Sequence, residues 1–119
     1  MKIAVTSSGQ DLSSPVDPRF GRAAYIIIVD SATMAFEAVD NQKNVQAFKG
    51  AGIQAATMVS EKGAEALLTG YCGPNAFKTL QAAGVKVVQD VTGTVEEAVQ
   101  RCAAGELVYS EAPNKDGQW

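Results

Sequence analysis

The sequence predicts an α/β fold in which a mixed five-stranded sheet, with strand order 3-2-1-4-5, carries helices on both faces. Five apolar segments of strand length are distributed along the 119 residues. The first three follow one another without a helix between them, so they can form an antiparallel meander. The later ones alternate with helical segments, and such β-α-β units require parallel strands joined by right-handed crossovers. A chain of this length is sufficient for one domain, which we expect at residues 1–108, with a loosely ordered tail at 109–119.

The expected strands are apolar runs bounded by polar or glycine-bearing turns. The second run, AAYIIIVD, is apolar on both faces, which indicates a strand buried on both sides of the sheet. The third run is less apolar and is expected near an edge, after a hairpin at the polar link formed by Asp30 and Ser31. The five strands are expected at residues 2–5, 23–30, 32–41, 64–70 and 85–90.

Three helices are expected, at residues 51–63, 74–84 and 94–105. In the first helix, Ile53, Ala56 and Val59 form one apolar stripe. The second has Pro74 in its first turn and a glycine just past its end, which is the asymmetry typical of helices. The third is the clearest, because Thr94 and Glu97 form a capping box ahead of an apolar stripe that includes Cys102.

Composition excludes several classes of function. Apolar residues make up 46% of the chain and charged residues 19%, which is typical of globular proteins. The net charge of −3 argues against nucleic acid and anionic membranes as partners. No apolar run approaches the length of a membrane-spanning helix, so we expect a cytoplasmic protein. The chain has no histidine, which excludes imidazole zinc sites and Ser-His-Asp triads.

The candidate site lies where the first and fourth strands end side by side. In open α/β sheets, ligands bind beyond the carboxyl ends of the strands, at the point where connections diverge. The two loops there are TSSG (6–9) and TGYCGPN (69–75), and the second opens a helix whose free N–H groups favour an anion. Two further segments, RFGRA (19–23) and KGAG (49–52), would bring arginine and lysine to the same crevice. We therefore expect a compact, negatively charged ligand, unless these glycine loops are only tight turns.

The candidate ligand-binding residues come from these four loops. They are Ser7, Ser8, Gly9, Arg19, Phe20, Gly21, Arg22, Lys49, Gly50, Gly52, Gly70, Cys72, Gly73, Pro74 and Asn75.

Cys72 admits three interpretations. The YCGPN turn is similar to the CGPC turn of thioredoxins, and a helix N-terminus would lower the thiol pKa, but Asn75 replaces the resolving cysteine. A thiolate also suits a soft metal. One cysteine without histidine cannot complete a tetrahedral site, but Cys72 could assist or merely neighbour a cluster that carries its own sulfide. Finally, free cysteine often behaves as a small apolar core residue. Cys102 is expected to be buried against the core rather than to pair with Cys72.

Nucleases built on sheets of this kind bind divalent metals through carboxylates at the strand ends. A two-metal site needs a cluster of such carboxylates. The expected strand ends KIAVTSS and ALLTG carry no acid, so a nuclease is disfavoured. Asp11, Asp17 and Asp30 are instead typical loop and turn residues.

Five segments together resemble the NifX/NifB-like family, the dinitrogenase iron–molybdenum cofactor biosynthesis proteins, over roughly residues 1–105. They are MKIAV, RFGRAAYIIIVD, KGAGIQAA, LLTGYCGPNAFKTLQAAGVKV and GTVEEAV. The resemblance implies a ribonuclease-H-like three-layer fold without nuclease activity. It also implies a non-enzymatic carrier or scaffold for a molybdenum-containing metal–sulfide cluster. A chain of this length resembles the small stand-alone members of the family. That resemblance implies a molybdenum–copper sulfide cluster, or a related molybdenum or iron–sulfur cluster, held without conventional protein ligands. It also implies MinD-type ATPases as candidate partners.

One departure from the family bears on how such a cluster would be held. Many members have histidine where this chain has Lys49, and lysine can replace it as a cation but not as a soft ligand. This difference favours electrostatic capture. Two alternatives remain at this point: an interaction module that works with a MinD-type ATPase, and a thiol-dependent redox enzyme acting through Cys72.

Overall fold

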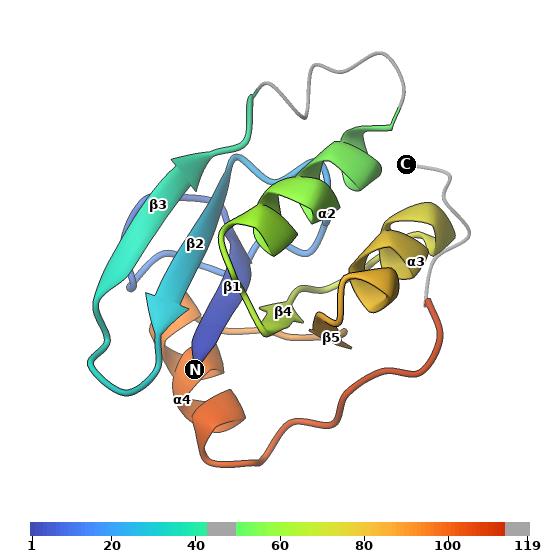
Figure 1. The fold of residues 1–119 in the computed structure, drawn as a ribbon. Coiled ribbons are helices and arrows are strands. Elements are labelled where there is room, and N and C mark those ends of the chain that lie inside the picture. Colours follow the sequence, from blue (N-terminus) through green and yellow to red (C-terminus); the bar gives the residue numbers. More distant parts are fainter. Residues whose placement is uncertain (43–49, 114–119) are drawn as a thin grey trace.

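The computed structural model describes residues 1–42 and 50–113. The five strands form one mixed sheet in the order β3-β2-β1-β4-β5 (Figure 1), which confirms the predicted order. The strands are β1 (Lys2–Ser7), β2 (Tyr25–Asp30), β3 (Phe36–Asp40), β4 (Ala66–Leu68) and β5 (Lys86–Val88). The first three pair as an antiparallel meander, β4 lies parallel to β1, and β5 lies parallel to β4.

Helices cover both faces of this sheet. The described helices are α2 (Ala51–Glu61), α3 (Pro74–Ala82) and α4 (Val95–Ala103). Helices α2 and α3 lie together over one face, and α4 lies on the other (Figure 1). All three confirm the expected helices and end slightly earlier than expected, just before glycines with positive φ that stop them.

The pleat of the central strands divides the core into two clusters. Ile3 and Val5 of β1 pack on the α4 side, whereas Ala4 between them packs on the side of α2 and α3. Successive side chains of a strand point to opposite faces, so a strand covered on both faces must be apolar throughout. All three residues are fully buried, as are most of those in β2, which confirms the expectation of a doubly covered sheet.

The β2–β3 connection differs from the expected short hairpin. The third strand begins at Phe36 rather than at residue 32. Between the strands, the Met34 N–H donates to the Asp30 carbonyl at 2.7 Å, and the Asp30 N–H donates to the Ala35 carbonyl at 2.9 Å. Met34 adopts a left-handed conformation with φ of 63° in this turn. A longer turn therefore replaces the first residues of the expected strand, and β3 itself lies at the edge of the sheet as predicted.

Part of the expected C-terminal tail attaches to the last strand. The Ser110 N–H donates to the Val87 carbonyl at 2.6 Å, and the Gln89 side-chain amide donates to the Ala112 carbonyl at 2.8 Å. Residues 114–119 of the expected tail lie outside the described residues. Within the described part of the chain, no helix has the length and apolar character needed to cross a membrane.

Candidate anion-binding site

A cavity of about 180 Å³ opens where the first turns of α2 and α3 meet the loop that precedes β2. Helix α3 follows β4 directly, so its first turn lies beyond the carboxyl end of that strand, which is the edge predicted to hold the site. The cavity is lined by Phe20, Gly21, Arg22, Gly50, Ala51, Gly52, Ile53, Gly73, Pro74, Asn75 and Ala76. Three separate segments of the chain therefore supply its walls.

Two helix N-termini face this cavity without side-chain caps. The N-cap residues are Gly50 for α2 and Gly73 for α3, and neither helix has a capping side chain or an acidic residue in its first turn. By contrast, α4 has a complete capping box. The first N–H groups of a helix have no partner within the helix and carry its positive dipole end. In α2 and α3 these donors can serve a bound anion, because no capping side chain from the described residues occupies them.

Close backbone packing holds the two helix starts and the loop together. A Cβ atom on Gly21 would lie 3.0 Å from the Gly52 Cα, and one on Gly52 would lie 3.2 Å from the Ala76 Cβ. Gly21 also has φ of 89°, a conformation that side chains rarely adopt. Larger residues at these positions would push the three segments apart. The small residues thus set the width of the cavity.

Charge and polarity around the cavity favour a soft anion. Among the described lining residues, Arg22 is cationic and none is acidic. Phe20 forms a buried apolar wall, and Ile53 is 41% exposed at the rim. This position of Ile53 departs from the expected inward stripe of α2, whose buried residues are Ala55, Ala56 and Val59. The cavity therefore combines backbone donors, one guanidinium group and apolar surface.

Eight of the fifteen residues expected to bind a ligand line this cavity. They are Phe20, Gly21, Arg22, Gly50, Gly52, Gly73, Pro74 and Asn75. Lys49 lies outside the described residues. Ala51, Ile53 and Ala76 line the cavity but were not expected. The sequence feature that could have identified them is their position in the first turn of a helix that begins after a glycine.

The first expected loop, residues 7–9, does not line the cavity. The Ser7 hydroxyl donates to the Gly9 carbonyl at 2.7 Å, and the Ser8 N–H donates to the Pro15 carbonyl at 3.1 Å. A Cβ atom on Gly9 would lie 2.5 Å from the Ser14 hydroxyl oxygen. The loop thus makes its contacts within itself, with residues 14–16 and, through Ser7, with Tyr25. Here the interpretation as a tight turn fits the structure.

Arg19 and Gly70 lie next to the site but do not line it. The Arg19 guanidinium lies 3.6 Å from the Asp17 carboxylate. A Cβ atom on Gly70 would lie only 2.6 Å from the Pro18 Cα, so Gly70 is required for close backbone contact. Both residues serve the loop that leads to the cavity.

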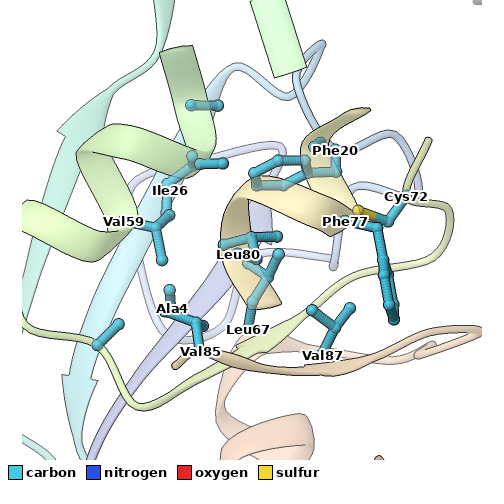
Figure 2. Close-up of a cluster of buried hydrophobic side chains, with 14 of the residues drawn as sticks. Ala4, Phe20, Ile26, Val59, Leu67, Cys72, Phe77, Leu80, Val85 and Val87 are labelled. Carbon is cyan, nitrogen blue, oxygen red and sulfur yellow. The ribbon is translucent and has the colours of Figure 1, made fainter. Parts of the chain in front are cut away.

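Cys72 is fully buried and belongs to the core. It lies in the same cluster as Phe20 and Phe77 (Figure 2) and does not line the cavity. Burial raises the pKa of its thiol to about 12, the direction opposite to that expected from a helix N-terminus. This favours the interpretation as an apolar core residue. No group of three or more cysteine and carboxylate ligands is assembled among the described residues.

The sequence matches the dinitrogenase iron-molybdenum cofactor family over residues 1–105. The fold is similar to that of the apo form of the orange protein from Desulfovibrio gigas, with 53% identity, 96% of each chain covered and a TM-score of 0.93. A NifB-like protein from Thermotoga is 39% identical over 98% of each chain, with a TM-score of 0.82.

A dinitrogenase-like protein from Methanocaldococcus jannaschii shares the fold at 14% identity, with 95% of this chain and 97% of that chain covered and a TM-score of 0.71. No curated protein sequence matches the chain. The match to the family covers nearly the whole described fold, including all three segments that form the cavity. The chain belongs to the dinitrogenase iron-molybdenum cofactor family.

Proposed function

We propose that this protein is a non-enzymatic carrier or scaffold for an anionic, molybdenum-containing metal–sulfide cluster, with a molybdenum–copper sulfide cluster as the cargo. One observation carries the proposal: the uncapped N-termini of α2 and α3 converge with Arg22 on a single cavity whose described lining has no acidic residue. Such a site attracts an anion although the whole chain is acidic, because the field at short range is set by local groups.

The chemistry of the lining suits a preassembled sulfide cluster. Backbone N–H groups can donate to terminal sulfides, and Arg22 can offset part of the negative charge. Ile53 and Phe20 present apolar surface to a ligand whose sulfur atoms are large and polarisable. The cavity is smaller than the roughly 300–1,000 Å³ of pockets that enclose drug-sized ligands, so part of the cluster would stay in water. Partial exposure limits the cost of removing its charge from solvent.

The same lining argues against catalysis. No carboxylate and no thiol lines the cavity in the described part of the chain. Cys72 is fully buried in the core cluster with its pKa raised to about 12, so it is protonated at neutral pH. General acid–base and nucleophilic catalysis need a titratable or activated group within reach of the ligand. The similarity to the orange protein and the family match support a binding role as well.

Reconstitution tests the proposal directly. The pure protein is mixed with tetrathiomolybdate and copper(I), passed over a desalting column, and examined for metal content and visible absorption. We expect a fixed ratio of molybdenum to protein and a charge-transfer band that elutes with the protein. Molybdate, which lacks sulfide, is the matched control and should not be retained. Elution of the protein without metal would contradict the proposal. If this metal-free protein instead bound a MinD-type ATPase, its function would be that of an interaction module.

A further inference from the structure

Three polar residues are buried together at the carboxyl ends of β1 and β4. Thr6 and Thr69 have no exposed surface, and Asp17 is 8% exposed. The Thr6 hydroxyl oxygen lies 2.6 Å from the Asp17 carbonyl oxygen and 2.9 Å from the Thr69 hydroxyl oxygen. A carbonyl can only accept, so the Thr6 hydroxyl donates to Asp17 and the Thr69 hydroxyl donates to Thr6. Buried polar groups are costly unless they are paired in this way.

Thr6 forms hydrogen bonds with both the carbonyl and the N–H group of Asp17. Besides the hydroxyl contact, the Thr6 carbonyl accepts from the Asp17 N–H at 2.9 Å. The Asp17 carboxylate in turn accepts from the Arg19 N–H at 2.9 Å, which fixes the turn that follows. Asp17 is thus tied to the end of β1 by two hydrogen bonds, one of which depends on a side chain.

From Asp17 the chain runs directly to the cavity. We call residues 17–22 the strap. Along it, the Tyr71 N–H donates to the Pro18 carbonyl at 2.6 Å, and the Phe20 N–H donates to the Tyr71 carbonyl at 3.1 Å. Pro18 rests on Gly70, and the far end of the strap supplies Phe20, Gly21 and Arg22 to the cavity wall. The strap therefore pairs with the segment that follows β4, next to Thr69.

We infer that Thr6 and Thr69 are positioning residues for the anion site: their hydroxyl chain holds the strap in register with the ends of β1 and β4 and so places Arg22 and the Gly21 backbone beside the first turn of α2. This inference rests on the proposed function for its effect on the ligand. It assigns a role to polar side chains that lie outside the cavity lining.

The test compares three variants of the full chain. Thr6→Val keeps the shape of the side chain and removes the hydroxyl. Thr6→Ser keeps the hydroxyl at the same position and is the conservative control. Val99→Ala removes core volume on the α4 face, away from the strap, and controls for a general loss of stability. All are studied at a temperature where more than about 95% of each variant is folded.

Two readouts separate positioning from stability. The first is hydrogen–deuterium exchange of the Phe20 and Tyr71 amides, the two N–H groups that close the strap. The second is the Kd for tetrathiomolybdate. For Thr6→Val we expect exchange at these amides to rise about tenfold and the Kd to rise about fivefold or more. Thr6→Ser should match the wild type in both, and Val99→Ala should leave the Kd unchanged.

Two results would overturn the inference: unchanged exchange in Thr6→Val, or raised exchange with wild-type affinity. If the wild type does not bind tetrathiomolybdate, the proposed function fails, and the exchange experiment alone decides the role of the network. A selective rise at Phe20 and Tyr71 then supports its hold on the strap, and no rise overturns it.

Discussion

Gly21 and Gly52 meet backbone to backbone beside the cavity: a Cβ atom on Gly21 would lie 3.0 Å from the Gly52 Cα and 3.1 Å from its amide nitrogen. One glycine belongs to the strap and the other to the first turn of α2. Their contact therefore joins two segments that are about thirty positions apart in the sequence. At this contact the strap lies beside the N–H groups of the first turn of α2.

Replacing Gly21 by alanine should damage both stability and binding. The new Cβ has no space, and the positive φ of 89° adds backbone strain. Gly84→Ala is the matched control, because Gly84 has φ of 80° and no described atom within 4 Å of the position that a Cβ would take. Strain alone should cost about 1–2 kcal/mol in the control. Gly21→Ala should cost at least about 1 kcal/mol more.

Urea unfolding of both variants measures these free energies, and tetrathiomolybdate titration measures binding. Only Gly21→Ala should weaken binding. Equal losses of stability in the two variants would mean that the contact with Gly52 is not tight. Unchanged affinity in Gly21→Ala would separate the strap from the ligand site.

Reversing the charge of Arg22 should weaken cluster uptake. Arg22→Glu replaces the cation among the described lining residues by an anion. Two unit charges a few ångströms apart interact by about 1–4 kcal/mol near a protein surface, so we expect the Kd for tetrathiomolybdate to rise at least about tenfold. Lys86→Glu makes the same change of net charge at the exposed start of β5, away from the cavity lining.

Uptake by the Lys86 variant should stay within about twofold of the wild type. The difference between the two variants should shrink as salt is added, because salt screens exposed charges. Cys72→Ser should weaken uptake less than Arg22→Glu does. The reverse ranking would make Cys72 a ligand of the cluster.

The Cys72 thiol should react slowly with alkylating reagents in the folded protein. It is fully buried, and burial raises its pKa to about 12. The thiolate is the reactive form, so iodoacetamide at neutral pH should modify Cys72 far more slowly than an unfolded control peptide. Rapid modification with an apparent pKa near neutrality would restore the redox interpretation.

The same pKa shift predicts how stability depends on alkaline pH. In the unfolded chain the thiol has a pKa of about 8.5, and in the folded protein it stays protonated until about pH 12. The stability that the protonated Cys72 thiol contributes is therefore complete below its pKa in the unfolded chain. It is lost as the pH rises toward its pKa in the folded protein. Cys72→Ala lacks this group, so its free energy of unfolding should fall less between about pH 8 and 10 than that of the wild type. Parallel curves would contradict the assigned shift.

Weakening the cap of α4 should lower stability without affecting the site. The Thr94 hydroxyl accepts from the Glu97 N–H at 3.2 Å, and the Glu97 carboxylate accepts from the Thr94 N–H at 3.0 Å. Thr94→Ala should therefore lower the free energy of unfolding by about 0.5–2 kcal/mol. Tetrathiomolybdate affinity should not change, because the hydrogen bonds of the cap lie within residues 94–97, none of which lines the cavity. A loss of affinity would mean that the two faces are coupled.

The capping box also predicts that the stability of the protein falls at acidic pH. Hydrogen bonds from the Thr94 backbone N–H and then from its hydroxyl lower the pKa of Glu97. This contribution to stability is complete above the ordinary glutamate pKa of about 4.3 and is lost as the pH falls through the lowered value. In Glu97→Gln the corresponding part of the acid-induced loss should be absent. Thermal unfolding of both proteins from about pH 7 to 3 measures it.

Short-range signals in the sequence predicted most of the fold. The meander and the two crossovers follow from the placement of apolar runs and from the right-handed rule for crossovers. The order 3-2-1-4-5 was one arrangement that these units allow, and the strand pairing of the structure confirms it. The Thr94 cap was predicted for the same reason, since all of its hydrogen bonds lie within four residues. The edge position of β3 followed from its lower apolar content.

The candidate site was only half predictable. The sequence allowed several residues of the site to be recognised as candidates, namely the glycines before α2 and α3 and the pair Gly21 and Arg22. A glycine that opens a helix is a local feature of the sequence. The direction of the loop at residues 7–9 could not, because it depends on hydrogen bonds to Pro15 and on contact with Ser14. The burial of Cys72 in the core was likewise undetermined, since a cysteine just before a helix can face either water or the core.

The sequence by itself determined the meander, the β-α-β units and the three helices, because periodicity, capping and crossover handedness are encoded by neighbouring residues. It also indicated the edge at the carboxyl ends of the strands as the candidate position for a ligand. The tertiary structure alone decided which residues reach that edge. Gly21 packs closely against Gly52, and Gly70 packs closely against Pro18, so Gly70 supports the site from outside its lining. Burial places Cys72 in the core, and Ile53 lies at the rim of the cavity, because both depend on contacts between distant segments.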